Sequence, residues 1–443
     1  MISLFKHQEE AANWLMKNGS GLIWAATGVG KTLIAATYAE RLMMRSGRFR
    51  VLIICPSSVR YQWQAELKKY YSIGACVIEG TPTVRKTLWE NNVQYKIVNY
   101  ELLLKDYKYA LPLDWDLVIA DECHRLANAR AKTVRIIKKL NARFRVALSA
   151  TPICNGKYDL FSQADWIKPG CLGQSWWSFR QEYCVMHAAF PKIIGYRNSE
   201  RFDRITAPLI FRIGKEVLSD LPPISESVVP FMLSLAERKI YDRAKDELRI
   251  ELEGRDDITI LNALTKLLRL RQICNGSRSL SGGPGLSSKL STLMDLLSDI
   301  LEDETAKVII FTSFAETARD YYPDLSAKWQ GSRITGETSQ DQRAVELSKF
   351  ENEASQRFLL GTEALSTGLN IQAANFIIHV DEPWSYSKYD QRNGRAWRQG
   401  QKRHVQVYSL IAQKTVDEYV HKVIEGKKSE VDITWNNINE ILK

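Results

Sequence analysis

Apolar positions in the first third of the chain form short continuous runs rather than alternating patterns. Such runs favour strands that are buried on both faces of a parallel sheet. They lie at residues 21–25, 51–55, 75–79, 96–99, 116–120 and 145–149. Between them, residues 31–44 and 59–70 carry the apolar spacing of helices. This part of the chain is therefore predicted to be an α/β unit.

The same alternation of strand-like and helix-like segments returns later in the chain. Its apolar runs lie at residues 307–312, 357–362, 375–380 and 405–411. Residues 152–280 read mostly helical, and the Gly- and Ser-rich stretch near their end is typical of a flexible linker. The predicted fold class is α/β, with two parallel-sheet lobes and a mainly helical insertion between them. The predicted boundaries are lobe 1 at 1–155, the insertion at 156–276, the linker at 277–288 and lobe 2 at 289–443.

Net charge and cysteine spacing indicate the class of partner and the redox compartment of the protein. The 443 residues include 61 Lys and Arg against 51 Asp and Glu, a net charge of +10. A basic surplus favours polyanion partners such as nucleic acid, although a merely solvated basic surface explains the charge equally well. The seven cysteines form no CxxC pair, which fits a reducing compartment. Neither a signal-peptide pattern nor an apolar run of the ~20 residues that a membrane helix needs is present, so we expect a cytoplasmic protein.

The stretch AATGVGKT, at residues 25–32, nearly matches the phosphate-binding pattern G-x-x-x-x-G-K-[ST]. Ala25 replaces the first glycine, and the other positions carry Gly28, Gly30, Lys31 and Thr32. Glycines let successive backbone N–H groups face phosphate oxygens, and the helix that follows adds its positive end. Lys31 would contact the outer phosphates, and the Thr32 hydroxyl would bind Mg²⁺. The alternative is a turn of small residues without a ligand.

A second signal is DLVIADECH, in which an apolar strand ends in the adjacent acids Asp121 and Glu122. At the carboxyl edge of a strand, Asp121 would face the magnesium ion. Glu122 would then orient and deprotonate an attacking water, because phosphoryl transfer depends mostly on positioning and charge. The alternative is an exposed turn with solvated acids.

The motifs GVGKT, DECH and SATP occur in an order that resembles superfamily-two helicase motors. The segments LFKHQEEAANWL, LIICPSSVRYQWQAEL, IVNYELL and LLRLRQICNG…SSKL resemble the Swi/Snf-type branch of double-stranded DNA translocases. The likeness covers roughly residues 4–423. It implies two RecA-like lobes, ATP and Mg²⁺ as cofactors, and DNA as the partner. The chain departs from the family pattern at two places. AATG stands in place of an acidic residue ahead of the phosphate loop, and ALSTG stands in place of a double glycine.

The resemblance assigns further residues to the nucleotide. It makes Gln8 the amide that reads the base. The segment YDQRNGRAWRQGQ meets the family pattern at Gln391, Arg395 and Arg398. The two arginines are three positions apart, so on a helix they would share a face. A basic solvated helix or a DNA-backbone contact is the alternative, but the family pattern makes them arginine fingers that face the γ-phosphate from the second lobe.

The resemblance also implies contacts with the DNA backbone, where hydroxyl and backbone groups bond phosphates without reading bases. These predicted nucleic-acid contacts are Ser57, Tyr100, Thr312, Ser313, Thr335, Ser366, Thr367 and Gly368.

A motor of this kind suits the remodelling of double-stranded or branched DNA, at junctions or forks in replication, recombination or repair. We expect it to work as a monomer. Removal of proteins from DNA is the alternative, and an RNA helicase or a nucleotide switch without motor action are rivals from other classes. Trp176 and Trp177 either supply a wedge that stacks on bases or belong to the core.

Overall fold

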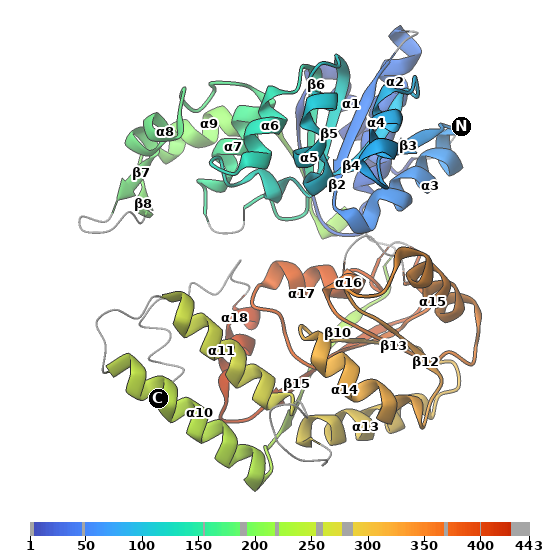
Figure 1. Cartoon of the computed structure of the whole chain (residues 1–443), viewed down its shortest axis with the longest axis vertical. Coiled ribbons are helices and arrows are strands. Elements are labelled where there is room, and N and C mark those ends of the chain that lie inside the picture. The colour runs from blue at the N-terminus through green and yellow to red at the C-terminus, as the bar shows by residue number, and fades with distance from the viewer. Residues whose placement is uncertain are drawn as a thin grey trace. The chain divides into compact units, whose positions relative to one another are not determined.

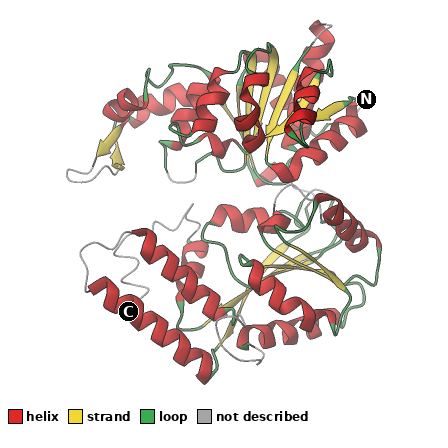
Figure 2. Cartoon of the chain, viewed as in Figure 1, coloured by secondary structure: helices red, strands yellow, loops and turns green. Residues whose placement is uncertain are grey.

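The computed structural model describes residues 4–46, 49–153, 156–186, 193–217, 221–253, 260–276, 287–366, 371–398 and 400–426. Contacts divide the chain into two compact units, Met1–Ser219 and Asp220–Lys443. Each unit contains one parallel sheet with helices against it (Figures 1 and 2). The predicted fold class, two parallel-sheet lobes, is confirmed.

The sheet of the first unit has seven strands in the order β3-β4-β2-β5-β6-β1-β9, all parallel. The strands are β1 (Gly21–Ala25), β2 (Val51–Cys55), β3 (Ala75–Val77), β4 (Tyr95–Asn99), β5 (Trp115–Asp121), β6 (Ala142–Ser149) and β9 (Ile210–Ile213). Every residue of β2 and β4 is buried, as their apolar runs predict.

Helices accompany this sheet along the chain, and a short antiparallel pair lies apart from it. The helices are α1 (Lys6–Asn18), α2 (Lys31–Ser46), α3 (Arg60–Tyr71), α4 (Pro82–Glu90), α5 (Tyr100–Ala110), α6 (Lys132–Lys139), α7 (Asp159–Ile167), α8 (Trp176–Tyr183) and α9 (Ser199–Thr206). Four short 3₁₀ turns are η1 (Ser57–Val59), η2 (Cys123–Leu126), η3 (Ala207–Leu209) and η4 (Lys215–Val217). The antiparallel pair is β7 (Cys184–Met186) with β8 (Ile193–Tyr196).

The sheet of the second unit has six parallel strands in the order β10-β15-β14-β11-β13-β12. The strands are β10 (Ile224–Phe231), β11 (Val308–Phe311), β12 (Gly331–Ile334), β13 (Phe358–Gly361), β14 (Phe376–His379) and β15 (Val405–Ala412). The helices are α10 (Leu235–Glu253), α11 (Ile260–Cys274), α13 (Ser288–Leu301), α14 (Ala315–Ser326), α15 (Gln340–Asn352), α16 (Glu363–Ser366), α17 (Tyr386–Asn393) and α18 (Val416–Glu425).

The core of the second unit has two layers, one on each face of its sheet. Along β11, Val308 and Ile310 belong to one buried cluster, and Ile309 and Phe311 belong to the other. Side chains alternate between the two faces of a strand, so a strand covered on both sides must be apolar at every position. This requirement explains the continuous apolar runs of the sequence.

The division between the units falls inside the region predicted as a helical insertion. Strand β9 joins the sheet of the first unit, whereas β10 joins that of the second, together with α10 and α11. One part of the predicted insertion thus belongs to the first unit and the other part to the second. The predicted boundaries of a separate insertion stay a prediction. Among the described residues, no helix combines the length and apolar character that crossing a membrane requires.

Candidate active site

The phosphate-loop residues lie between the carboxyl end of β1 and the start of α2. Gly28 and Gly30 have φ values of 87° and 84°, in the left-handed region that glycine adopts without strain. A Cβ atom on Gly30 would also overlap Nε2 of Gln8. The loop conformation therefore requires glycine at this position, and the Gln8 side chain of α1 packs directly against it.

Gln8 is buried and supports the loop directly. Its Nε2 donates to the carbonyl of Val29 at 3.0 Å, and its Oε1 accepts from the N–H of Phe5 at 3.1 Å. The ring of His7 lies 3.2 Å from the same Val29 carbonyl. In this structure the Gln8 amide fixes the loop to α1, and its role in reading a base stays a prediction.

Lys31 is the first residue of α2, and its Nζ donates to the carbonyls of Ala25 and Ala26 at 3.0 and 3.3 Å. The ammonium group therefore lies over the loop itself. A lysine, a glycine-containing loop and the N-terminus of a 16-residue helix together form an anion cradle. This geometry offers the donors that a phosphate site needs, and phosphate binding by these residues stays a prediction.

The acid pair lies at the carboxyl end of β5, and its orientation is fixed by neighbours. Asp121 accepts from Nε1 of Trp63 and from the N–H of Glu122, both at 2.9 Å. Glu122 has φ 52° and ψ 54°, a left-handed conformation that is uncommon outside glycine. Its carboxylate lies 3.2 Å from Nδ1 of His124. The alternative of loosely solvated acids does not describe this turn.

Burial and, after it, the nearby charge of Glu122 raise the pKa of Asp121 to about 6. The Trp63 hydrogen bond and the positive charge of Lys31 lower the pKa of Asp121. Lys31 is therefore close enough to interact electrostatically with this carboxyl group. Two adjacent acids that are both partly withdrawn from solvent favour a bound cation, which would offset their repulsion.

These residues fit Mg²⁺ bound with ATP. Across the described ranges, no group of three or more His, Cys, Asp or Glu side chains forms a metal cluster. Mg²⁺ commonly takes one or two protein oxygens together with phosphates and waters. Asp121 and the hydroxyl of Thr32 are the protein oxygens that would contact it.

The SATP segment lies beside the other two motifs because β6 lies between β5 and β1 in the sheet. Ser149 Oγ accepts from the N–H of Thr151 at 3.0 Å and lies 3.5 Å from His124. Nε1 of Trp24 donates to the carbonyl of Ala150 at 3.0 Å. Sheet order thus brings three motifs that are far apart in sequence to one edge.

The arginines predicted as fingers lie in the second unit, but not on a helix. Helix α17 ends at Asn393, so Arg395 and Arg398 occupy the turn that follows, and the expected shared helical face is wrong. Nε of Arg395 donates to the carbonyl of Gln391 at 3.0 Å. Buried Gln401, which bonds the carbonyls of residues 372, 374 and 396, braces this turn.

Two of the predicted DNA contacts in the first unit differ in position. Ser57 is exposed at the start of η1, where a backbone contact is feasible. Tyr100 is 3% exposed, and its hydroxyl donates to the carbonyl of Asp121 at 2.6 Å. This correction follows from burial: the Tyr100 side chain supports the acid pair and does not present its hydroxyl to DNA.

In the second unit, Thr312 is fully buried and its hydroxyl donates to Asp381 at 2.6 Å, so this side chain is also not presented to DNA. The N–H of Ser313 donates to the same carboxylate at 2.8 Å. Thr335 is buried, with its N–H bonded to Thr338. Ser366 ends α16, and nothing is described of its side chain. Thr367 and Gly368 lie outside the described residues.

The two tryptophans of α8 separate. Trp176 packs against Phe161 and Phe179, with ring centroids 5.4 Å apart in both cases. Trp177 is 68% exposed. Trp176 is therefore a partly buried side chain that packs against the core, and of the two only Trp177 is left for a surface role.

Two family models match the chain. The SNF2-related domain matches residues 7–279, and the helicase conserved C-terminal domain matches residues 288–400. Together they cover most of both units.

The chain is also similar to curated proteins and to a solved structure. An uncharacterized ATP-dependent helicase of Mycoplasma pneumoniae is 28% identical over 98% of this chain and 42% of its own length. The putative ATP-dependent helicase/translocase YwqA of Bacillus subtilis is 28% identical over 96% of this chain and 48% of its own length. The chain thus spans less than half the length of these relatives. The Sulfolobus solfataricus SWI2/SNF2 ATPase core in complex with dsDNA is 25% identical, covers 99% of this chain and 97% of its own, and has a TM-score of 0.48.

Proposed function

The chain belongs to the SNF2-related family of helicase-type proteins, and from that membership we propose that it hydrolyses ATP to move along double-stranded DNA. One observation carries the proposal. The anion cradle around Lys31 and the acid pair Asp121–Glu122 lie at one sheet edge, close enough for Lys31 to lower the pKa of Asp121. That arrangement suits cleavage of a phosphoanhydride.

The residues divide the chemistry between them. Mg²⁺ bound with ATP would supply positive charge at the outer phosphates. Lys31 and the loop N–H groups bind those phosphates, and Glu122 accepts the proton of the attacking water. Arg395 and Arg398 offset the charge that develops during cleavage. Hydrolysis therefore depends on residues of both units.

Duplex DNA is the proposed track. The net charge of +10 favours a polyanion, and names of relatives include "helicase/translocase" and "Chromodomain-helicase-DNA-binding protein 1-like". Backbone contacts bind DNA without regard to sequence, and such binding weakens steeply with rising salt, because the release of counterions from DNA becomes less favourable.

The finer proposal is remodelling of branched DNA, with removal of proteins from DNA as the alternative. Exposed Trp177 supports the first, because an aromatic ring on the surface can stack on bases that are unpaired at a junction. Protein removal requires only movement along an intact duplex.

ATP turnover with blunt duplex, single-stranded DNA, RNA and a four-way junction tests these proposals together. We expect duplex DNA to stimulate turnover, and we expect ATP-dependent branch migration of the four-way junction. Stimulation by RNA alone would indicate an RNA helicase, and equally low turnover with every nucleic acid would indicate a nucleotide switch. Duplex stimulation without junction activity would favour protein removal.

A further inference from the structure

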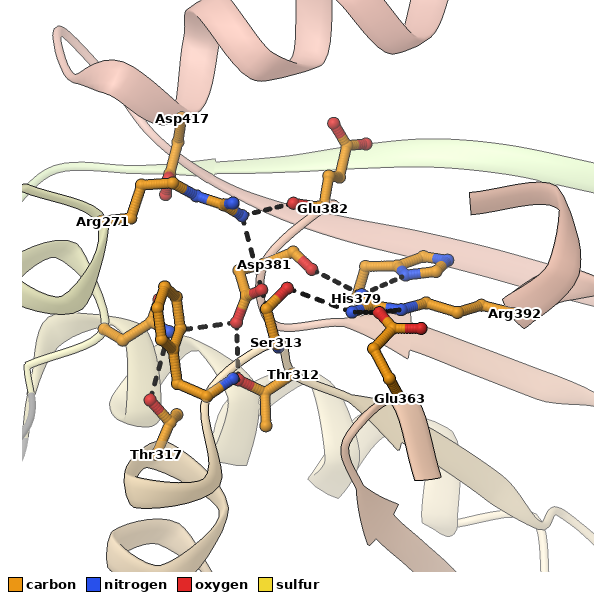
Figure 3. A network of polar contacts seen from close by, with 12 residues as sticks. Arg271, Thr312, Ser313, Thr317, Glu363, His379, Asp381, Glu382, Arg392 and Asp417 are labelled. Carbon is orange, nitrogen blue, oxygen red and sulfur yellow. Dashed lines mark hydrogen bonds and ion pairs between the residues drawn. The ribbon is translucent and has the colours of Figure 1, made fainter. Parts of the chain in front are cut away.

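A buried carboxylate, Asp381, lies just beyond the carboxyl end of β14 and gathers donors from several elements (Figure 3). Its side chain accepts from Thr312 Oγ1 at 2.6 Å and from the N–H of Ser313 at 2.8 Å. Asn275 Nδ2 donates to it at 3.0 Å, and Nη2 of Arg271 at 3.4 Å. Asp381 thus links the end of α11 to the loop after β11.

Arg392 brings α17 into the same network. Its guanidinium group is fully buried and donates to the carbonyl of Asp381 at 2.8 Å and to Ser313 Oγ at 3.1 Å. Nε and Nη2 also donate to Glu363 Oε1, at 3.0 and 2.5 Å. In Figure 3, Arg392 lies between Glu363 and the Asp381 segment. One side chain therefore connects α16, α17 and the Ser313 loop.

The network is charged. Burial raises the pKa of Asp381, but the cations Arg271, Arg392 and Lys289 outweigh it and bring the value to about 2. Burial and Arg392 lower the pKa of His379 to about 3, so this ring is neutral. Asp381 therefore stays ionised over the whole physiological pH range, while Arg392 donates to its main-chain carbonyl and to Glu363.

Stability alone is a poor explanation for this arrangement. Buried ion networks often contribute no more stability than apolar side chains of similar size, because the charges lose their hydration. Nε and Nη1 of Arg271 have no hydrogen-bond acceptor among the residues that the structure describes. Such a network adds little stability, but it fixes the relative positions of the elements that it joins.

We propose that Arg392 is a positioning residue that couples DNA contact to ATP hydrolysis. It bonds Ser313, a predicted DNA contact, and it belongs to the helix that leads into Arg395 and Arg398. Glu363 fixes the direction of its guanidinium group. The inference rests on the proposed function, because it concerns how the second unit relates DNA to the nucleotide.

The test compares Arg392→Lys with Arg357→Lys. Lysine keeps the charge but loses the planar fork that bonds several partners at once. Arg357 is a matched control from the same sheet, but at the amino end of β13. There it donates to the carbonyls of residues 301, 303 and 306. Steady-state ATPase with and without duplex DNA gives kcat and KM, and thermal unfolding reports folding.

For Arg392→Lys we expect the ratio of DNA-stimulated to basal kcat to fall about tenfold, within the usual range of coupling between sites, with KM for ATP within about twofold. Arg357→Lys should keep the wild-type ratio. Glu363→Gln, at a side chain 38% exposed, should reduce the ratio in the same direction and decides the matter if Arg392→Lys unfolds.

Equal loss of basal and stimulated rates in Arg392→Lys, or a wild-type ratio in Glu363→Gln, would overturn this inference alone. A wild-type protein whose ATPase ignores duplex DNA would overturn the proposed function, and this inference with it.

Discussion

At the scale of single residues, Glu122 gives a direct test of the proposed general base. Its left-handed backbone and its contact with His124 fix the direction of its carboxylate. Glu122→Gln keeps the shape but removes the base, so turnover should fall by about 10²–10⁴ while ATP and DNA still bind. Steady-state ATPase and equilibrium nucleotide binding check this, with the exposed Glu101→Gln as control. Undiminished turnover would show that Glu122 is not the base.

Gly30 gives a second test at this scale. A methyl group there meets Gln8 and forces a φ of 84° on a residue with a Cβ atom. Gly30→Ala should destabilise the protein by about 1–3 kcal/mol and weaken ATP binding. Gly74→Ala is the control, because a Cβ atom at that position meets nothing within 4 Å. Equal behaviour of the two variants in thermal unfolding and nucleotide titration would contradict the structure of the loop.

Residue types predicted the chemistry of the site better than they predicted the direction of its side chains. The phosphate loop and the acid pair were each predicted at the end of an apolar strand, and the sheet order of the structure brings them to one edge. Tyr100 and Thr312 have hydroxyl groups that suit a phosphate contact, yet both donate inward. A sequence pattern does not tell an inward hydroxyl from an outward one at the end of a strand.

At the scale of elements, helix α8 carries Trp176, which packs against the core, and Trp177, which is exposed to solvent. Trp177→Ala should leave duplex-stimulated ATPase within about twofold but reduce junction processing, because base stacking contributes about 1–3 kcal/mol. Trp176→Ala should instead destabilise the first unit, since its ring packs against the core. Junction assays and thermal unfolding separate the two. Full junction activity in Trp177→Ala would remove the stacking role.

Helix α18 is linked to the segment after β14 through a titrating pair. Hydrogen bonding to Glu382 raises the pKa of His421, with Glu425 also close at 3.4 Å. The folded state therefore binds the proton more tightly than the unfolded state. This contribution to stability is full below the unfolded pKa of about 6.5 and is lost as pH rises through the folded value.

Replacing His421 tests that linkage. Unfolding free energy measured from pH 5 to 9 should decline over this window in the wild-type protein, and His421→Gln should flatten the decline. Identical slopes in the two proteins would show that the pair does not contribute.

The sequence predicted most strands but not all of them, for reasons visible in each element. Strand β15 was expected at 405–411 and lies at Val405–Ala412. Strand β10 was missed because it is partly exposed and mixes polar with apolar positions, and β12 is a four-residue edge strand. The helical placement of Arg395 and Arg398 failed because Gly394 caps α17 just before them.

At the scale of the whole molecule, each unit carries half of the proposed chemistry. The first holds the anion cradle and the acid pair, and the second holds the arginines and the network around Asp381. The proposed hydrolysis assigns roles to both sets of residues.

The most direct measurement is ATP turnover of Arg398→Ala in the presence of duplex DNA, with ATP affinity measured in parallel. Arginine fingers contribute about 10³–10⁵ in rate. We predict a loss of this order in kcat with little change in ATP affinity. Turnover at the wild-type rate, with only DNA affinity reduced, would contradict the account and make Arg398 a contact with the DNA backbone.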